Sequence, residues 1–162
     1  MKKIILIRHA ESPFGYIKIK DFDRPLNETG ISEANLMGNQ IKKYKMKVDC
    51  IITSGANRAF NTSSIIANCI CYNIKKIKID DNIYNSSTDF MINLINNISD
   101  DYKTVMIFGH NPTLHHLSQI LSGEIIINFP TCTMYSIIFD ISSWSEIIKG
   151  KKEFMIYPDL FK

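Results

Sequence analysis

The sequence has no long apolar run, and this absence excludes two classes of protein. No stretch of its 162 residues approaches the ~20 apolar residues that a membrane-spanning helix needs. The apolar run at residues 4–7 is too short for a signal peptide, and the polar residues Arg8, His9 and Glu11 come directly after it. We therefore expect a cytoplasmic protein with no membrane partner.

Cysteines and excess charge are also scarce. Only four cysteines are present, without the Cys-x-x-Cys spacing of a zinc site, and Cys69 and Cys71 are too close and too isolated to bind a metal. We interpret all four as core thiols in a reducing compartment. The net charge is +3, and the lysine clusters at residues 42–47 and 149–152 belong to no recognised nucleic-acid motif. We expect these clusters to be solvated faces, and no nucleic-acid partner.

The remaining composition is that of a globular protein. Hydrophobic residues make up 45% of the chain and charged residues 22%, so disorder is not expected. The length fits one domain with a substantial core. Internal repeats and low-complexity linkers are lacking, and we interpret residues 1–162 as a single domain.

Strand-like and helix-like segments alternate along the chain. Apolar runs predict strands at residues 4–7, 48–53, 74–79, 104–108, 133–141 and 153–157. Helical spacing and capping residues predict five helices. The first begins at Thr29-Gly30 with Thr29 as N-cap, the second begins at residue 55, and the third lies around Phe90 and Leu94. The fourth runs from the N-cap Asn111 to Ser122 with Gly123 as the stop, and the fifth covers residues 143–149. The alternation predicts a three-layer α/β/α sandwich with a mostly parallel central sheet.

Cationic side chains follow three of the predicted strands. Arg8 and His9 end the first, Arg58 lies in the first turn of the helix after the second, and His110 follows the fourth. The carboxyl ends of parallel strands meet at one edge of a sheet, where ligands bind. A cation at the position of Arg58 is opposed by the helix dipole by up to ~1 kcal/mol, and an anion bound there would explain its presence. Together these residues predict a phosphoryl-binding site, because arginine binds phosphate oxygens bidentately and histidine is a nucleophile.

Taken singly, the same residues have simpler interpretations. Arg8 and His9 are equally well explained as a strand end that returns to solvent, and Arg58 as an exposed arginine that tolerates a small penalty. His115 and His116 have no carboxylate or cysteine at ligand spacing, and we expect them to be surface histidines outside any metal site. Only the repetition at three strand ends favours a functional site.

The order and spacing of these residues resemble the histidine phosphatase superfamily, whose members share an Arg-His-Gly/Ala motif after the first strand. The resemblance is closer to the branch of small SixA-like phosphohistidine phosphatases. The matching residues span nearly the whole chain: Arg8-His9-Ala10, Asp23-Arg24-Pro25-Leu26 with Gly30, Ser54 with Arg58-Ala59 and Thr62, Gly109-His110-Asn111-Pro112, and Trp144, Gly150 and Pro158. The resemblance implies a phosphoglycerate mutase-like fold without a cap domain, and catalysis without a metal or other cofactor.

The resemblance also implies a role for each site residue. His9 would attack phosphorus and carry the phosphoryl group as a phosphohistidine, which water then hydrolyses. Arg8, Arg58 and His110 would hold the equatorial oxygens, where charge is spread in the transition state. Arg24, in the long polar connection after the first strand, is a further candidate for a substrate contact. The sequence does not identify the partner of the second ring nitrogen of His9.

One departure from the family pattern bears on the substrate. Mutases and sugar phosphatases of the superfamily carry a glutamate after the third strand that protonates an alkoxide leaving group, whereas this chain has Asn82-Ile83-Tyr84-Asn85 there. Asp81, Asp89 and Glu11 are alternative acids that no motif places in this role, so the general acid is unknown. An imidazole leaving group, with a pKa near ~6.5, needs far less help.

We therefore expect a monomer that removes phosphate from phosphohistidine in a protein. One alternative is a broad or small-molecule phosphomonoesterase, whose partner is a small phosphate ester. The other alternative is a non-catalytic phosphate-binding module with the same pocket.

Overall fold

One mixed sheet forms the centre of the molecule. The computed structural model describes residues 1–15 and 18–162, so Tyr16 and Ile17 of the predicted polar connection lie outside the described residues. The strands are β1 (Lys2–Arg8), β2 (Cys50–Thr53), β3 (Lys78–Ile79), β4 (Thr104–Gly109), β5 (Met134–Phe139) and β6 (Lys151–Ile156). Their order is β3-β2-β4-β1-β5-β6; β5 is antiparallel to β1 and β6, and the other pairs are parallel. The predicted mostly parallel sheet is confirmed.

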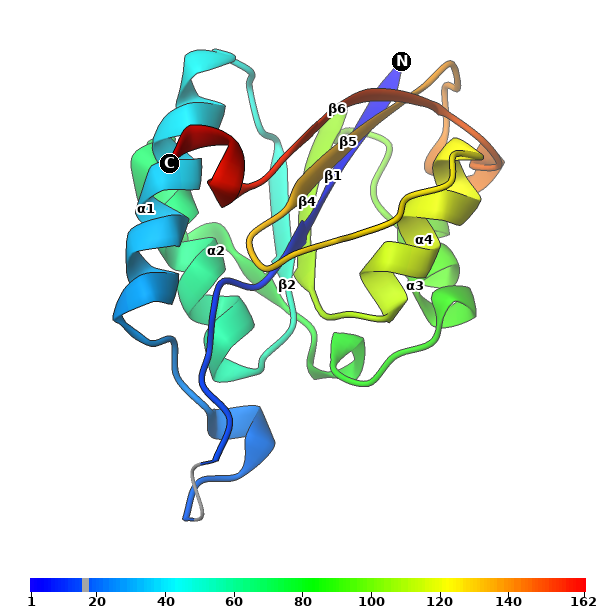
Figure 1. Ribbon diagram of the computed structural model, residues 1–162. Helices are drawn as coiled ribbons and strands as arrows, with labels where there is room; N and C mark the ends of the chain where they lie inside the picture. The colour runs from blue at the N-terminus through cyan, green and yellow to red at the C-terminus, as the bar shows by residue number, and fades with distance from the viewer. Residues whose placement is uncertain (16–17) are drawn as a thin grey trace.

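Helices cover both faces of this sheet. They are α1 (Glu28–Lys43), α2 (Asn57–Cys69), α3 (Thr88–Asn96) and α4 (Thr113–Ser122). Figure 1 shows α1 and α2 on one side of the sheet and α3 and α4 on the other. Ile5 and Ile7 of β1 belong to the core under α1 and α2, whereas Ile4 and Leu6 belong to the core under α3 and α4. Burial on both faces explains the continuous apolar run of β1, and the three-layer sandwich is confirmed.

The first helix begins earlier than predicted. Asn27 is its N-cap, because the Asn27 side chain accepts a hydrogen bond from the Gly30 N–H at 2.7 Å, and Thr29 lies inside the helix. A Cβ atom on residue 30 would lie 2.1 Å from the Glu11 carbonyl oxygen. Glycine at this position therefore allows α1 to pack against the chain that leaves β1.

The start of α4 also differs from the prediction. The helix begins at Thr113, with Pro112 at the cap position. Asn111 does not cap it, because its side-chain amide donates to the Phe129 carbonyl at 2.9 Å instead. Gly123, with a φ of 72°, ends α4 as predicted.

Two predicted elements are shorter in the structure. The predicted strand at residues 74–79 is a 3₁₀ turn (Ile74–Lys76) followed by β3, which is an exposed edge strand of two residues. The predicted helix at residues 143–149 is a single 3₁₀ turn (Trp144–Glu146). Three lysines interrupt the alternation of the first segment, and the second segment is too short to form a stable helix.

The carboxyl ends of β1, β2 and β4 meet at one edge of the sheet, the lower edge in Figure 1. Arg8 pairs with Gly109 in the parallel register, and this pairing brings the next residues, His9 and His110, side by side. In the part of the chain that the structure describes, no helix combines the length and the apolar character needed to cross a bilayer.

Candidate active site

A cavity of about 320 Å³ opens at this edge of the sheet. All five residues predicted for the site line it, namely Arg8, His9, Arg24, Arg58 and His110. They come from the end of β1, the connection before α1, the first turn of α2 and the end of β4. The parallel topology therefore brings together residues that are far apart in the sequence.

His9 presents one ring nitrogen without a proton. Its Nδ1 lies 2.7 Å from the Ala10 carbonyl oxygen, and a carbonyl only accepts, so Nδ1 carries the proton of the neutral ring. The lone pair is then on Nε2, which lies 3.4 Å from Nε of Arg58. Burial, together with nearby positive charges, lowers the pKa of His9 to about 3, although the hydrogen bond to Ala10 opposes this shift. At neutral pH, Nε2 is therefore available as a nucleophile.

Two guanidinium groups accompany His9, that of buried Arg58 and that of half-buried Arg8. Arg58 is 5% exposed, and it donates from Nη1 to the Asp21 carbonyl at 2.7 Å and from Nη2 to the Asp21 carboxylate at 3.1 Å. Arg8 donates from Nη1 to the Phe129 carbonyl at 3.0 Å. Burial and the charge of Arg58 lower the pKa of Arg8. A phosphoryl dianion between the two guanidiniums would offset this repulsion.

His110 lies beside His9, with ring centroids 5.2 Å apart. Its Nε2 is 2.9 Å from the hydroxyl oxygen of Ser54, the residue that follows β2, so Ser54 orients the ring. Burial, followed by the charge of Arg58, lowers the pKa of His110 to about 4. His110 is therefore a neutral hydrogen-bonding group at pH 7.

Arg24 holds the connection before α1 in place. Its Nη1 donates to the Ser12 carbonyl at 2.8 Å, to the Ser12 hydroxyl at 3.0 Å and to the Pro13 carbonyl at 3.0 Å. Its Nε and Nη2 face the Asp21 carboxylate at 3.2 and 3.1 Å, and its guanidinium lies 4.5 Å from the Phe14 ring centroid. These donors are already engaged within the connection, so a substrate contact by Arg24 stays a prediction.

Asp21 is a site residue that the sequence analysis missed. Its carboxylate accepts hydrogen bonds from Arg24, from Arg58 and, at 2.6 Å, from the Tyr84 hydroxyl. The Tyr84 hydrogen bond and the two guanidiniums lower the pKa of Asp21 to about 2. Asp21 is thus an ionised group that orients Arg58. The only sequence signal is its position three residues before Arg24, and this spacing is common on protein surfaces.

The three acids that the sequence offers as proton donors, Glu11, Asp81 and Asp89, differ in whether they line the cavity. Glu11 lines the cavity, and its carboxylate accepts a hydrogen bond from the Asn27 side chain at 2.9 Å. Asp81 and Asp89 are not among the lining residues. Tyr84, from the segment where mutases carry their glutamate, lies edge-on to His110 with ring centroids 5.5 Å apart. Of the three acids, Glu11 alone therefore lies in the cavity.

The two histidines of α4 lie outside this cavity. His116 is exposed as predicted, but His115 is half-buried, with Nε2 at the Ile126 carbonyl, so the surface prediction is wrong for His115. Within residues 1–15 and 18–162, no group of three or more His, Cys, Asp or Glu side chains is arranged to hold a metal ion.

The four predicted core cysteines differ in burial. Cys50 and Cys132 are buried as predicted, Cys69 is half-buried, and Cys71 is exposed, so the core prediction is wrong for Cys71.

We expect the protein to lose stability as the pH falls from about 6.5 to 4. In the folded state, the pKa values of His9 and His110 are about 3 and about 4, below the ordinary 6.5. The unfolded chain therefore binds more protons in this window, and the free energy of unfolding decreases by ~1.4 kcal/mol per pH unit for each histidine. Above pH ~6.5 neither histidine contributes. Urea unfolding at several pH values measures the slope.

Two variants separate this effect from general acid sensitivity. His110→Asn removes one of the two groups and should reduce the slope by about half. His116→Asn makes the same substitution outside the cavity and is the matched control. An unchanged slope in His110→Asn would contradict the assignment.

Fold and site together define a class: a three-layer α/β protein with a cavity at the strand ends that is lined by two histidines and three arginines. A sequence profile of the histidine phosphatase superfamily (branch 1) matches residues 4–83. An uncharacterized protein of Mycobacterium tuberculosis is 32% identical over 122 residues, which cover 72% of this chain and 70% of the relative. An uncharacterized chloroplastic protein of Arabidopsis thaliana is 26% identical in an alignment of 172 positions, which covers 98% of this chain and 78% of the relative. The chain belongs to the histidine phosphatase superfamily.

Solved structures share the fold over nearly the full chain. The SixA protein from Agrobacterium tumefaciens matches with a TM-score of 0.84 at 24% identity, covering 97% of this chain and 98% of that chain. The protein histidine phosphatase SixA complexed with tungstate matches with a TM-score of 0.82 at 20% identity, covering 99% of each chain. A mycobacterial glucosyl-3-phosphoglycerate phosphatase matches with a TM-score of 0.67 at 12% identity, covering 98% and 99%. The predicted phosphoglycerate mutase-like fold, in its SixA-like form, is confirmed.

Proposed function

We propose that the protein removes the phosphoryl group from phosphohistidine in a protein substrate, through a phosphohistidine formed on its own His9. The observation that carries this proposal is the tautomer of His9. The Ala10 carbonyl accepts from Nδ1–H, so the lone pair is on Nε2, which lies in a cavity lined by Arg8 and Arg58 and accepts a 3.4 Å hydrogen bond from Nε of Arg58. Membership of the histidine phosphatase superfamily supports hydrolysis at phosphorus.

The reaction has two similar steps. His9 Nε2 forms a bond to phosphorus while the bond from phosphorus to the substrate imidazole breaks, and its electron pair leaves with that imidazole. A substrate ring protonated at its other nitrogen departs as neutral imidazole. In the second step, a water oxygen attacks phosphorus and the bond to His9 breaks. Both protons of the water stay on the phosphate, and His9 returns to its neutral form.

In this proposal, Arg8, Arg58 and His110 bind the three equatorial oxygens during both steps. Each lines the same cavity as His9. Donors that are already fixed by the fold stabilise the developing charge without reorganisation, and such stabilisation is a large part of phosphoryl-transfer catalysis. The Asp21 carboxylate and the Ser54 hydroxyl act indirectly, because they hold Arg58 and His110.

The surroundings of the leaving group favour phosphohistidine over a phosphate ester. An alkoxide must be protonated as it leaves, and a positioned acid contributes ~10²–10⁴-fold to such a step. Asp21, with a pKa of about 2, is ionised at neutral pH and is engaged by two guanidiniums. Glu11 is engaged by the Asn27 amide. A neutral imidazole leaves without such an acid.

We also propose that residues 1–162 form one histidine phosphatase domain without a cap. The single six-stranded sheet with helices on both faces supports this interpretation.

The test is a substrate panel. The purified protein is assayed with a phosphohistidine-bearing protein and with a series of phosphomonoesters, including 4-nitrophenyl phosphate and sugar phosphates. We expect kcat/KM to be at least ~100-fold higher for the phosphohistidine protein than for alkyl phosphates. The reason is that an alkoxide leaving group needs a positioned acid of the enzyme, whereas the carboxylates of Asp21 and Glu11 are already engaged. Efficient cleavage of an alkyl phosphate with the phosphohistidine protein untouched would support a small-molecule phosphomonoesterase instead. Binding of phosphate without any turnover would support the non-catalytic module.

A further inference from the structure

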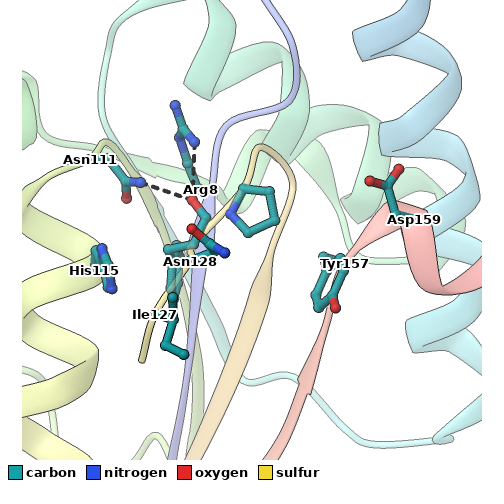
Figure 2. Close-up of a pocket in the computed structure, with 9 residues that line it drawn as sticks. Arg8, Asn111, His115, Ile127, Asn128, Tyr157 and Asp159 are labelled. Carbon is teal, nitrogen blue, oxygen red and sulfur yellow. Dashed lines mark hydrogen bonds between the residues drawn. The ribbon is translucent and has the colours of Figure 1, made fainter. Parts of the chain in front are cut away.

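A second cavity, of about 550 Å³, adjoins the catalytic cavity. The two share Arg8 and Asn111, which line both. In Figure 2, His115 of α4 lies on one side of this second cavity, and Tyr157 and Asp159 lie on the other. The reaction proposed above uses none of these last three residues.

The loop from α4 to β5 lines the cavity between these two sides, and this loop is hydrogen-bonded to Arg8. The Phe129 carbonyl accepts one hydrogen bond from Arg8 at 3.0 Å and another from Asn111 at 2.9 Å, drawn as dashed lines in Figure 2. The buried Phe129 ring stacks on His115, with centroids 5.8 Å apart. The loop is therefore an anchored wall whose position is coupled to that of Arg8.

The rims of both cavities carry large apolar side chains that face solvent. Ile127 is 85% exposed and lines the second cavity, and its neighbour Ile125 is 91% exposed. Phe14 is 88% exposed and lines the catalytic cavity. Single exposed apolar residues are ordinary, but Ile127 and Phe14 line two cavities that share Arg8 and Asn111, and exposed apolar side chains beside a site are typical of interaction surfaces.

The lining excludes some occupants. Arg8 and Asp159 are the charged residues of the second cavity, and the Asp159 carboxylate lies 3.2 Å from Lys162. A second phosphate group would thus meet one arginine, which is already the ligand of the first, and an acid. The remaining residues combine apolar surface with amide and hydroxyl groups, and this mixture suits the side chains and peptide groups of a polypeptide.

We propose that the second cavity binds the polypeptide that flanks the phosphohistidine of a protein substrate, with an apolar substrate side chain against Ile127. This inference rests on the proposed function and specifies where the protein part of the substrate lies. A chain that places its phosphorylated side chain on His9 passes the shared residues Arg8 and Asn111 and so enters the second cavity. A free phosphohistidine or a small ester occupies the catalytic cavity alone.

The test compares two exposed isoleucines. Ile127→Asp introduces a charge at the rim, and Ile148→Asp makes the same change at a position that is 80% exposed and lines neither cavity. We expect Ile127→Asp to lower kcat/KM about tenfold for a phosphohistidine protein, mainly through KM, because one apolar contact is lost. For free phosphohistidine we expect no change, and Ile148→Asp should be unchanged on both substrates.

A second variant fills the cavity instead of changing its polarity. Asn128 is exposed and lines the cavity, so Asn128→Trp should fold normally and should also reduce activity on the protein substrate alone. Equal losses on both substrates, or full activity of both variants on the protein, would overturn the inference while leaving the proposed function intact. A wild-type protein that leaves phosphohistidine protein untouched would overturn both.

Discussion

Replacing His9 with alanine is expected to lower kcat by about 10⁵–10⁶-fold, because the residue that forms the covalent intermediate is lost. The ring is neutral and held by the Ala10 carbonyl, with Nε2 toward Arg58, so a neighbouring side chain cannot take over its geometry. Incubation with a ³²P-labelled phosphohistidine protein followed by a rapid quench measures the intermediate. Wild type should carry an acid-labile label on His9, and His9→Ala should carry none.

The control for this experiment is another histidine. His116 is exposed on α4 and lines neither cavity, so His116→Ala should keep both turnover and labelling. Circular dichroism of His9→Ala shows whether the variant is folded. Labelling of folded His9→Ala at the wild-type level would place the nucleophile elsewhere.

Replacing Arg58 with lysine is expected to lower kcat by about 10²–10³-fold, although the positive charge is retained. The guanidinium directs Nε toward His9 and binds Asp21 through Nη1 and Nη2 at the same time. A lysine ammonium is a single point charge, so it cannot keep this fork and also contact a phosphoryl oxygen. Steady-state kinetics on the phosphohistidine protein measure the loss.

Asp21→Asn separates orientation of Arg58 from its charge. Asparagine keeps an acceptor oxygen but removes the negative charge that faces Arg58 and Arg24, so we expect a smaller loss of about tenfold in kcat/KM. Loss of activity in Arg58→Lys no greater than that in Asp21→Asn would contradict a direct role of Arg58 at phosphorus.

Arg24→Lys should mainly lower the melting temperature, because Arg24 donates to Ser12 and Pro13 within the connection.

Several features of the fold were predictable from local sequence because they depend on neighbouring residues. The apolar run of β1 is typical of a strand buried on both faces, and the core residues Ile4 to Ile7 are fully buried on its two sides. Gly123 marks the end of α4 because glycine adopts positive φ without strain. The positions of Arg8, Arg58 and His110 at strand ends and in a first helical turn follow from the same local patterns.

Local patterns failed where a distant segment competes for the same group. Asn111 is a residue type that is common at N-caps, but its side-chain amide donates to the Phe129 carbonyl. The N-cap of α1 is Asn27 instead of Thr29, and Gly30, whose N–H donates to the Asn27 side chain, packs against the backbone of Glu11. The short β3 shows the same limit, since an edge position in the sheet gives that segment a single partner strand.

The sequence by itself determined the class of fold and the chemical groups of the site, because strand periodicity, helix starts and the Arg-His motif each depend on a short stretch of chain. Only the tertiary structure decided how these groups are tuned. The Ala10 carbonyl sets the tautomer of His9, burial lowers its pKa to about 3, and Asp21 holds Arg58. Tautomer, burial and orientation depend on contacts between segments far apart in the chain, and residue types and spacing do not specify such contacts.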